Sequence, residues 1–129
     1  MIQYGFSKDL EIPYERVVEL VTEALKKEGF GILTEINVKD KFKEKLNVDF
    51  KKYVILGACN PPSAHKAITA EENIGLMLPC NVIVYENGTK TVLSIIKPTI
   101  AMQIINNEVL SAIAEHIELK LKNVFEAVG

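Results

Sequence analysis

The sequence predicts an α+β domain in which two long helices cover one face of a largely antiparallel sheet, in the order strand, helix, four strands, helix. Two segments carry apolar residues at helical spacing, one near each end of the chain. The dipeptide Asn87-Gly88 lies between two runs of β-branched residues, which is typical of a β-hairpin. No linker, repeat or low-complexity tract divides the 129 residues, so we expect residues 1–129 to form a single domain.

In the first half of the chain, residues 2–7 are expected to form a strand, followed by a helix in the segment PYERVVELVTEALKKEGFG, which begins at Pro13. Proline suits the first helical turn, and Gly29 suits a left-handed helix end. The apolar stripe of this helix consists of Tyr14, Val17, Val18, Val21 and Leu25. The elements expected next are a strand over 30–38, a short solvated helix over 39–48 and a strand over 51–59.

Two helices are expected in the second half of the chain. The shorter one covers 61–73, with Asn60 as its N-cap and Pro61 at its first position. The longer one covers 106–129 and begins at an asparagine cap. Its apolar stripe consists of Leu110, Ile113, Ile117, Leu121, Val124 and Val128.

Between these helices, the segment 80–98 reads as a hairpin with Asn87-Gly88 as a two-residue loop. That loop would place Cys80 opposite Ile95 and Asn81 opposite Ser94. Cys80 would then share a face with the apolar residues of the hairpin, whereas Asn81 would lie on the other face.

The strand at 53–59 is apolar on both faces. Two helices can cover only one face of such a sheet, so the second face needs another cover. A second copy of the chain is the simplest candidate, and we expect a homodimer that forms through the sheet face.

Composition and charge exclude several classes of partner. The formal net charge is -2, and no basic stripe is interleaved with aromatic residues, so we expect no nucleic-acid partner. No segment has the ~20 apolar residues of a membrane span, and no signal peptide is visible, so we expect no membrane partner and a cytoplasmic location. Both thiols are expected to stay reduced there.

The candidate site lies in the segment LGACNPPSAHKAITAEENIGLMLPCN, which holds both cysteines of the chain, each followed by asparagine. We expect one ligand-binding crevice lined by Cys59, Asn60, His65, Cys80 and Asn81. Because Cys59 immediately precedes a helix cap, unbonded N–H groups would lie close to it, which favours anions and lowers a thiol pKa. Small residues before it would let a ligand approach the backbone.

The expected path of the chain brings the two cysteines together. A helix from Pro61 to about Glu72 would lead away from Cys59, and an extended segment over 73–78 would return over a similar distance. The α-carbons of Cys59 and Cys80 would then lie within about 10 Å of each other, close enough for one ligand to contact both.

These residues admit several functions. The leading expectation is a small-ligand binding or sensing domain, and the alternative is a thiol-dependent enzyme or redox protein that uses Cys59. A third reading is a structural interaction module. The two cysteines and His65 lack the fourth ligand and the close spacing of a zinc site, so we expect no metal. The sequence identifies no cofactor.

The segments YVILGACNPPSAHKAI and IGLMLPCNVIVYE, together with the upstream GFGILTEINVKDKFKEKLNVDFKKY, resemble the domain-of-unknown-function family 302. The resemblance extends from about residue 14 to the C-terminus, and the GACNP and LPCN elements are its most specific part. It implies a small α+β domain similar in architecture to one repeat of the TATA-binding protein, and it implies homodimers. It implies no activity, and similarity of fold to a DNA-binding protein carries no function by itself.

Overall fold

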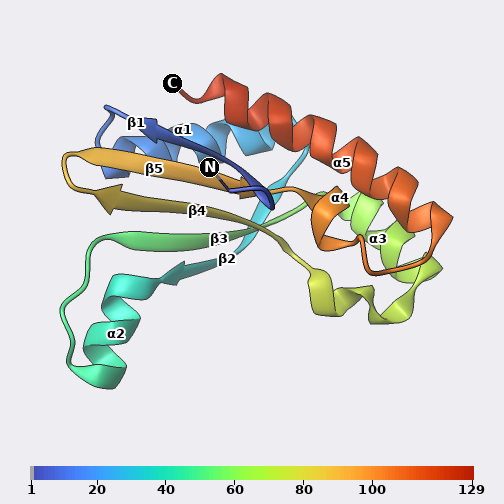
Figure 1. Ribbon diagram of the computed structural model, residues 1–129, viewed down its shortest axis with the longest axis horizontal. Helices are drawn as coiled ribbons and strands as arrows, with labels where there is room; N and C mark the ends of the chain where they lie inside the picture. Colours follow the sequence, from blue (N-terminus) through green and yellow to red (C-terminus); the bar gives the residue numbers. More distant parts are fainter. Residues whose placement is uncertain (1) are drawn as a thin grey trace.

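A computed structural model describes residues 2–129 and confirms the predicted α+β class (Figure 1). All strand pairs of the five-stranded sheet are antiparallel, and the strand order is β1-β5-β4-β3-β2. The strands are β1 (Gly5–Leu10), β2 (Gly31–Asn37), β3 (Tyr53–Cys59), β4 (Cys80–Asn87) and β5 (Lys90–Ile96). The helices are α1 (Tyr14–Lys27), α2 (Val38–Leu46), α3 (Pro61–Ala70), the 3-10 helix η1 (Glu72–Met77), α4 (Pro98–Ala101) and α5 (Glu108–Ala127).

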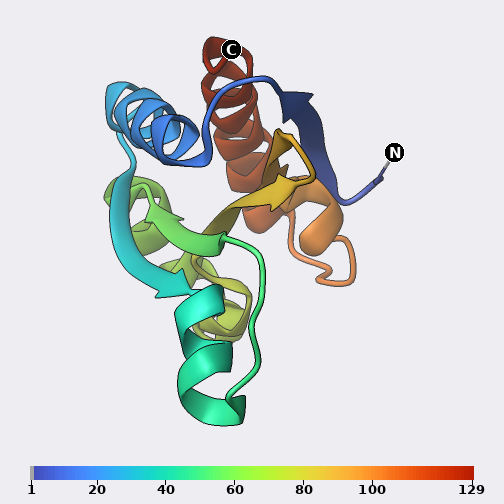
Figure 2. The same ribbon diagram turned by 90° about the vertical axis from the view of Figure 1, so that its left-hand side faces the viewer.

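The two long helices, α1 and α5, pack on the same face of the sheet, as predicted (Figures 1 and 2). Alternation along the strands turns one set of side chains towards them. The centre of this core consists of Val54, Leu56, Val82, Val84, Leu93 and Ile95, each at most 3% exposed. We call the whole cluster that these residues form with the buried side chains of α1 and α5 the main core.

Local signals for the helix ends behave as predicted. Gly29 has φ +85°, the left-handed conformation that ends α1. The Asn60 side chain accepts a hydrogen bond from the Ser63 N–H at 3.2 Å, and the Asn107 side chain caps α5 in the same way. Pro13 lies at the N-cap of α1 rather than inside its first turn.

The hairpin register differs from the prediction by two residues. Asn87 pairs with Lys90 and Val82 pairs with Ile95, so the loop residues are Gly88 and Thr89. Only Gly88 of the two has a positive φ, 63°, which is the requirement of a type II′ turn. Asn87 therefore does not adopt the left-handed conformation that a type I′ turn would require of it. Because the shift is two residues, every side chain keeps its predicted face.

Two further boundaries were wrong. The first strand covers Gly5–Leu10 instead of 2–7. It can continue through the charged residue Lys8, because Lys8 Nζ donates to the Phe125 backbone oxygen at 2.6 Å and lies 4.4 Å from the centre of the Phe125 ring. Lys8 thereby fits beneath α5. The segment expected to be extended, 73–78, is mostly the 3-10 helix η1. Its residue Ile74 is fully buried with Leu110 and Ala67 in a second, smaller hydrophobic cluster.

α2 projects away from the two layers (Figure 2). None of its residues is buried. Its Phe42 ring packs edge-on against the Phe50 ring, with the ring centres 5.1 Å apart. We call residues 31–50, which include β2, α2 and the segment after it, the β2–α2 arm. None of the helices within residues 2–129 is long and apolar enough to cross a membrane.

Candidate functional site

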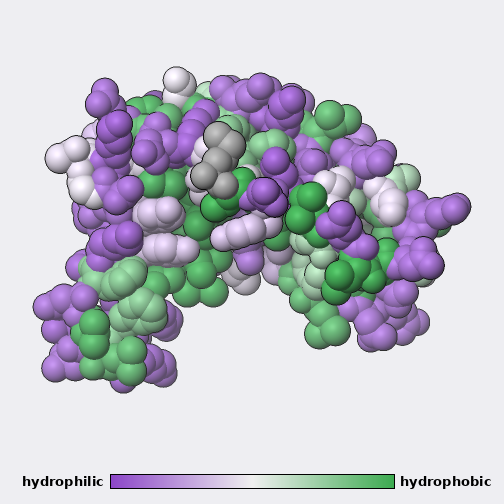
Figure 3. Space-filling model, viewed as in Figure 1, coloured by the Kyte–Doolittle hydropathy of each residue, from purple (hydrophilic) through white to green (hydrophobic). Residues whose placement is uncertain are grey.

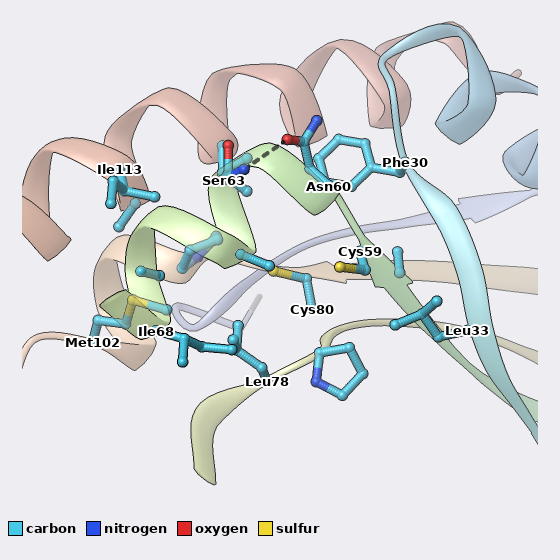
Figure 4. A pocket seen from close by; sticks show the side chains of 17 residues that line it. Phe30, Leu33, Cys59, Asn60, Ser63, Ile68, Leu78, Cys80, Met102 and Ile113 are labelled. Atoms are coloured by element: carbon cyan, nitrogen blue, oxygen red, sulfur yellow. Dashed lines mark hydrogen bonds between the residues drawn. The ribbon is translucent and has the colours of Figure 1, made fainter. Parts of the chain in front are cut away.

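A pocket of about 260 Å³ lies at the end of the sheet where β3 and β4 meet α3 and α5 (Figure 4). It lies between the main core and the second cluster, and both contribute to its walls. The residues that line it are Phe30, Leu33, Ala58, Cys59, Asn60, Ser63, Ala64, Ala67, Ile68, Leu78, Pro79, Cys80, Pro98, Met102, Ile113, Ala114 and Ile117.

Small side chains leave this space open. Ala58 of β3, Ala64 and Ala67 of α3, and Ala114 of α5 all line the pocket, and three of the four are at most 3% exposed. Larger side chains at these positions would interdigitate and fill the gap, as they do in the main core. The pocket is therefore a consequence of alanine at the junction of three elements.

The mouth of the pocket is apolar. β2 contains an irregularity between Ile32 and Thr34, where the register against β3 shifts by one residue. The extra residue, Leu33, is 66% exposed and lines the pocket, and Ile68 of α3 is 43% exposed. A β-bulge of this kind re-aims one side chain, here towards the pocket (Figure 4).

The structure brings the two cysteines together at this pocket. Cys80 pairs with Ala58, the residue next to Cys59, so their α-carbons lie within about 10 Å. Cys59 is the last residue of β3, and Figure 4 shows both sulfur atoms beside the same space. Both thiols are free and partly exposed.

The expected anion site next to Cys59 is not available, because the first turn of α3 has no spare N–H group. Pro61 and Pro62 have no N–H at all. The Ser63 N–H donates to the Asn60 side chain, and the Ala64 N–H donates to the Asn60 backbone oxygen at 2.9 Å. The backbone donors of residues 61–64 are thereby absent or occupied.

The thiol pKa values agree with this arrangement. Burial raises the pKa of the Cys59 thiol above its ordinary value of 9.0. Burial, together with the neighbouring Cys59, raises the pKa of Cys80 to about 11. The sequence predicts a lowered pKa for Cys59 instead. Desolvation by the apolar walls raises this pKa, and the start of α3 does not offset it because its N–H donors are already used.

Asn60 has a structural role on one side of the pocket. In addition to capping α3, its Nδ2 donates to the Gly29 backbone oxygen at 3.3 Å, which links α3 to the turn between α1 and β2. The space at Gly57 is likewise occupied: a Cβ there would lie 2.7 Å from Pro79 Cγ and would also collide with Thr34. The absence of a side chain at Gly57 makes room for Pro79 and Thr34 rather than for a ligand.

The other two predicted residues lie elsewhere. His65 is exposed on α3 and borders a separate shallow groove with Lys66 and Glu108. Asn81 lies on the uncovered face of the sheet, near Ser94, whose hydroxyl instead bonds the Ser7 hydroxyl at 2.7 Å. Of the five predicted residues, the structure thus brings together Cys59, Asn60 and Cys80.

Sequence reasoning missed the residues that shape the pocket. The spacing of Ala64 and Ala67 carried a signal, since residues three apart on a helix lie on the same face. Ala114, on a different helix, carried none. The bulge at Leu33 carried none, because the local sequence ILTEIN reads as an ordinary strand. Within residues 2–129, no group of three or more His, Cys, Asp or Glu side chains is arranged to hold a metal ion.

Comparison with known proteins places the chain in a family without assigned activity. A sequence model of the family described as a domain of unknown function, DUF302, matches residues 6–128. The crystal structure of an uncharacterized conserved DUF302 protein from Bacillus stearothermophilus is similar, with a TM-score of 0.91 and 31% sequence identity. The similarity covers 99% of this chain and 100% of that one. No curated protein matches the chain.

Proposed function

The chain belongs to the DUF302 family, and from its pocket we propose that it is a cytoplasmic domain that binds or senses a small ligand. The observation that carries the proposal is the 260 Å³ pocket with two free thiols on its wall. Ligand pockets of about 300–1,000 Å³ hold drug-sized molecules, so this one suits a smaller molecule. Free thiols support a reducing compartment.

Native mass spectrometry of protein purified without added ligand tests the proposal. We expect a fraction of the protein to carry a small non-covalent ligand, and we expect Ala114→Leu, which fills the pocket, to lose it. Ala112→Leu is the matched control, because Ala112 is exposed on the same helix. Ligand-free protein in every preparation, together with no saturable response to added toluene, would contradict the proposal.

The alternative function, a thiol-dependent enzyme or redox protein, requires a thiolate at neutral pH. The raised pKa values of Cys59 and Cys80 support binding instead. We expect alkylation by iodoacetamide to be slow at pH 7 and to accelerate above pH 9 at both cysteines, read by peptide mass spectrometry. Rapid alkylation of Cys59 at pH 7 would favour the enzyme.

We also propose that the protein is a homodimer that forms through the uncovered face of the sheet. On this face the Tyr53 and Tyr85 rings stack with their centres 5.1 Å apart, and Lys51 Nζ lies 4.7 Å from the centre of the Tyr85 ring. The face is hollowed between α2 and the part of the molecule that contains η1, as seen along the lower side of Figure 3.

The β2–α2 arm supports a second copy as the cover. Five of its large apolar side chains expose between 37% and 66% of their surface. α2, a helix of nine residues, has no buried residue and so is not stabilised by the core. A standard interface buries about 800 Å² per partner, roughly a tenth of the 7941 Å² surface of this chain. The net charge of -2 causes little repulsion between copies. The exposed apolar residues of the arm are Ile36, Leu46, Val48 and Phe50, in addition to Leu33 at the mouth of the pocket.

Sedimentation velocity tests the dimer. We expect twice the mass of the 14.4 kDa chain at micromolar concentration. Ile36→Lys, at a position 44% exposed on β2, should give a monomer, whereas Leu119→Lys, 65% exposed on α5, should not change the assembly. A monomeric unmodified protein would refute this proposal and leave the pocket proposal intact.

A further inference from the structure

The walls of the pocket restrict the charge of its ligand. Of the described residues that line it, none is Asp, Glu, Lys, Arg or His. A charged group that leaves water for such a site loses its hydration and gains no opposite charge. The mouth of the pocket, at Leu33 and Ile68, is apolar too, so a charged group gains no opposite charge there either.

Polar groups on the wall do not compensate for this cost. The Asn60 side chain accepts from the Ser63 N–H and donates to the Gly29 carbonyl. The Ser63 hydroxyl also lines the pocket, but it is neutral and, like the Asn60 amide, supplies no opposite charge. The first turn of α3 presents two prolines, so an anion finds no backbone donors there. The raised thiol pKa values keep both cysteines neutral at pH 7, so they cannot pair with a cation.

Sulfur and aromatic groups give the pocket a second preference. Cys59, Cys80 and Met102 contribute three sulfur atoms to the walls, and Phe30 contributes a ring (Figure 4). Sulfur is polarizable and makes favourable contacts with aromatic rings. An apolar cavity of about 150 Å³ holds benzene, so 260 Å³ admits about ten non-hydrogen atoms.

We infer that the ligand is an uncharged aromatic molecule of about ten non-hydrogen atoms, held between the two thiols and the alanine wall of α3 and α5. This inference rests on the proposed binding function and names the class of ligand for the same pocket. The ring lies against sulfur and alanine, and any polar substituent it carries is neutral.

Four one-ring probes test the inference by titration into the 15N-labelled protein, with amide chemical shifts as the readout. Toluene is the neutral aromatic probe, benzoate and benzylammonium carry opposite charges, and methylcyclohexane keeps the carbon skeleton of toluene without the aromatic ring. We expect saturable shifts of pocket amides with toluene, binding at least about tenfold weaker for both charged probes, and binding about threefold weaker for methylcyclohexane.

Variants locate the response. Ala114→Leu should weaken toluene binding at least about tenfold, and Ala112→Leu should leave it unchanged, because only Ala114 lines the pocket. Ala64→Leu takes the place of Ala114→Leu if that variant does not fold. Equal affinity for toluene and either charged probe, or for toluene and methylcyclohexane, overturns the inference but leaves the binding function. Failure of all four probes overturns the inference, and it overturns the binding function as well if native mass spectrometry also finds the protein free of ligand in every preparation.

Discussion

The main core and the pocket end of this molecule are built from different side chains, although the same helix, α5, contributes to both. In the main core, α5 contributes Leu121, which is fully buried against aliphatic side chains of the sheet. At the pocket it contributes Ala114, opposite the alanines of α3. Large interdigitated side chains fill space, whereas facing alanines leave it. The difference shows that a ligand-sized gap can arise from residue size alone, without a loop or a hinge.

The largest effect is expected from a truncation in the main core. Leu93→Ala removes a side chain of β5 that is fully buried in the main core, and it should lower the free energy of unfolding by about 2–5 kcal/mol. Urea denaturation measures the loss. A loss below about 1 kcal/mol would mean that the main core tolerates a change in side-chain size as well as the pocket wall does. The contrast between the two regions would then not hold.

The next largest effect compares the same enlargement in the two regions. Ala24→Leu on α1 overpacks the main core, where it should cost about 1–3 kcal/mol. Ala114→Leu places its added carbons in the pocket and should change stability by less than about 1 kcal/mol. Thermal and urea unfolding of both variants provide the comparison, and equal losses would show that the pocket wall cannot accept a larger side chain.

The pH dependence of stability tests the desolvation of the pocket wall. The pKa of Cys80 rises from an ordinary 9.0 in the unfolded chain to about 11 in the folded one. Below pH 9 both states keep the proton and stability is unaffected by this group. Above pH 9 the unfolded state loses it first, so stability falls as pH rises, by about 1.4 kcal/mol between pH 8 and pH 10. Cys80→Ala should lack that portion of the loss, and an identical pH profile for variant and parent would contradict the prediction.

The smallest effect concerns the cap that closes the first turn of α3. Asn60→Ala removes the acceptor for the Ser63 N–H and the donor to Gly29, and it should cost about 1 kcal/mol. Asn60→Asp retains the acceptor and should recover most of the loss. Circular dichroism during urea unfolding measures both, and an Asp variant as unstable as the Ala variant would assign the effect to the Gly29 contact.

Most of the fold was readable from local patterns. The stripes of α1 and α5, the caps at Asn60 and Asn107 and the positive φ of Gly29 each depend on a few neighbouring residues, which is why the sequence predicts them. The hairpin register depended on which of two glycine-containing turns forms, and a single dipeptide could not decide between them. The two-residue error kept Cys80 on the correct face.

The candidate site was only partly readable, because it depends on contacts between distant segments. The proximity of Cys59 and Cys80 follows from strand pairing, and the sequence argument reached it by a wrong path through an extended segment at 73–78. His65 and Asn81 belong to the same segment of the sequence, yet they lie at other surfaces of the molecule. Pro61 predicts the start of α3, whereas the missing N–H groups of Pro61 and Pro62 also change the chemistry beside Cys59.

The contact between Lys8 and Phe125 has a consequence for the order of folding. The two residues are 117 positions apart, and β1 joins the sheet only through β5. Contacts of such long separation form late, because the intervening chain must be ordered before they repay the entropy of closure. During synthesis, β1 therefore waits for β5 and for α5, which both follow it in the chain.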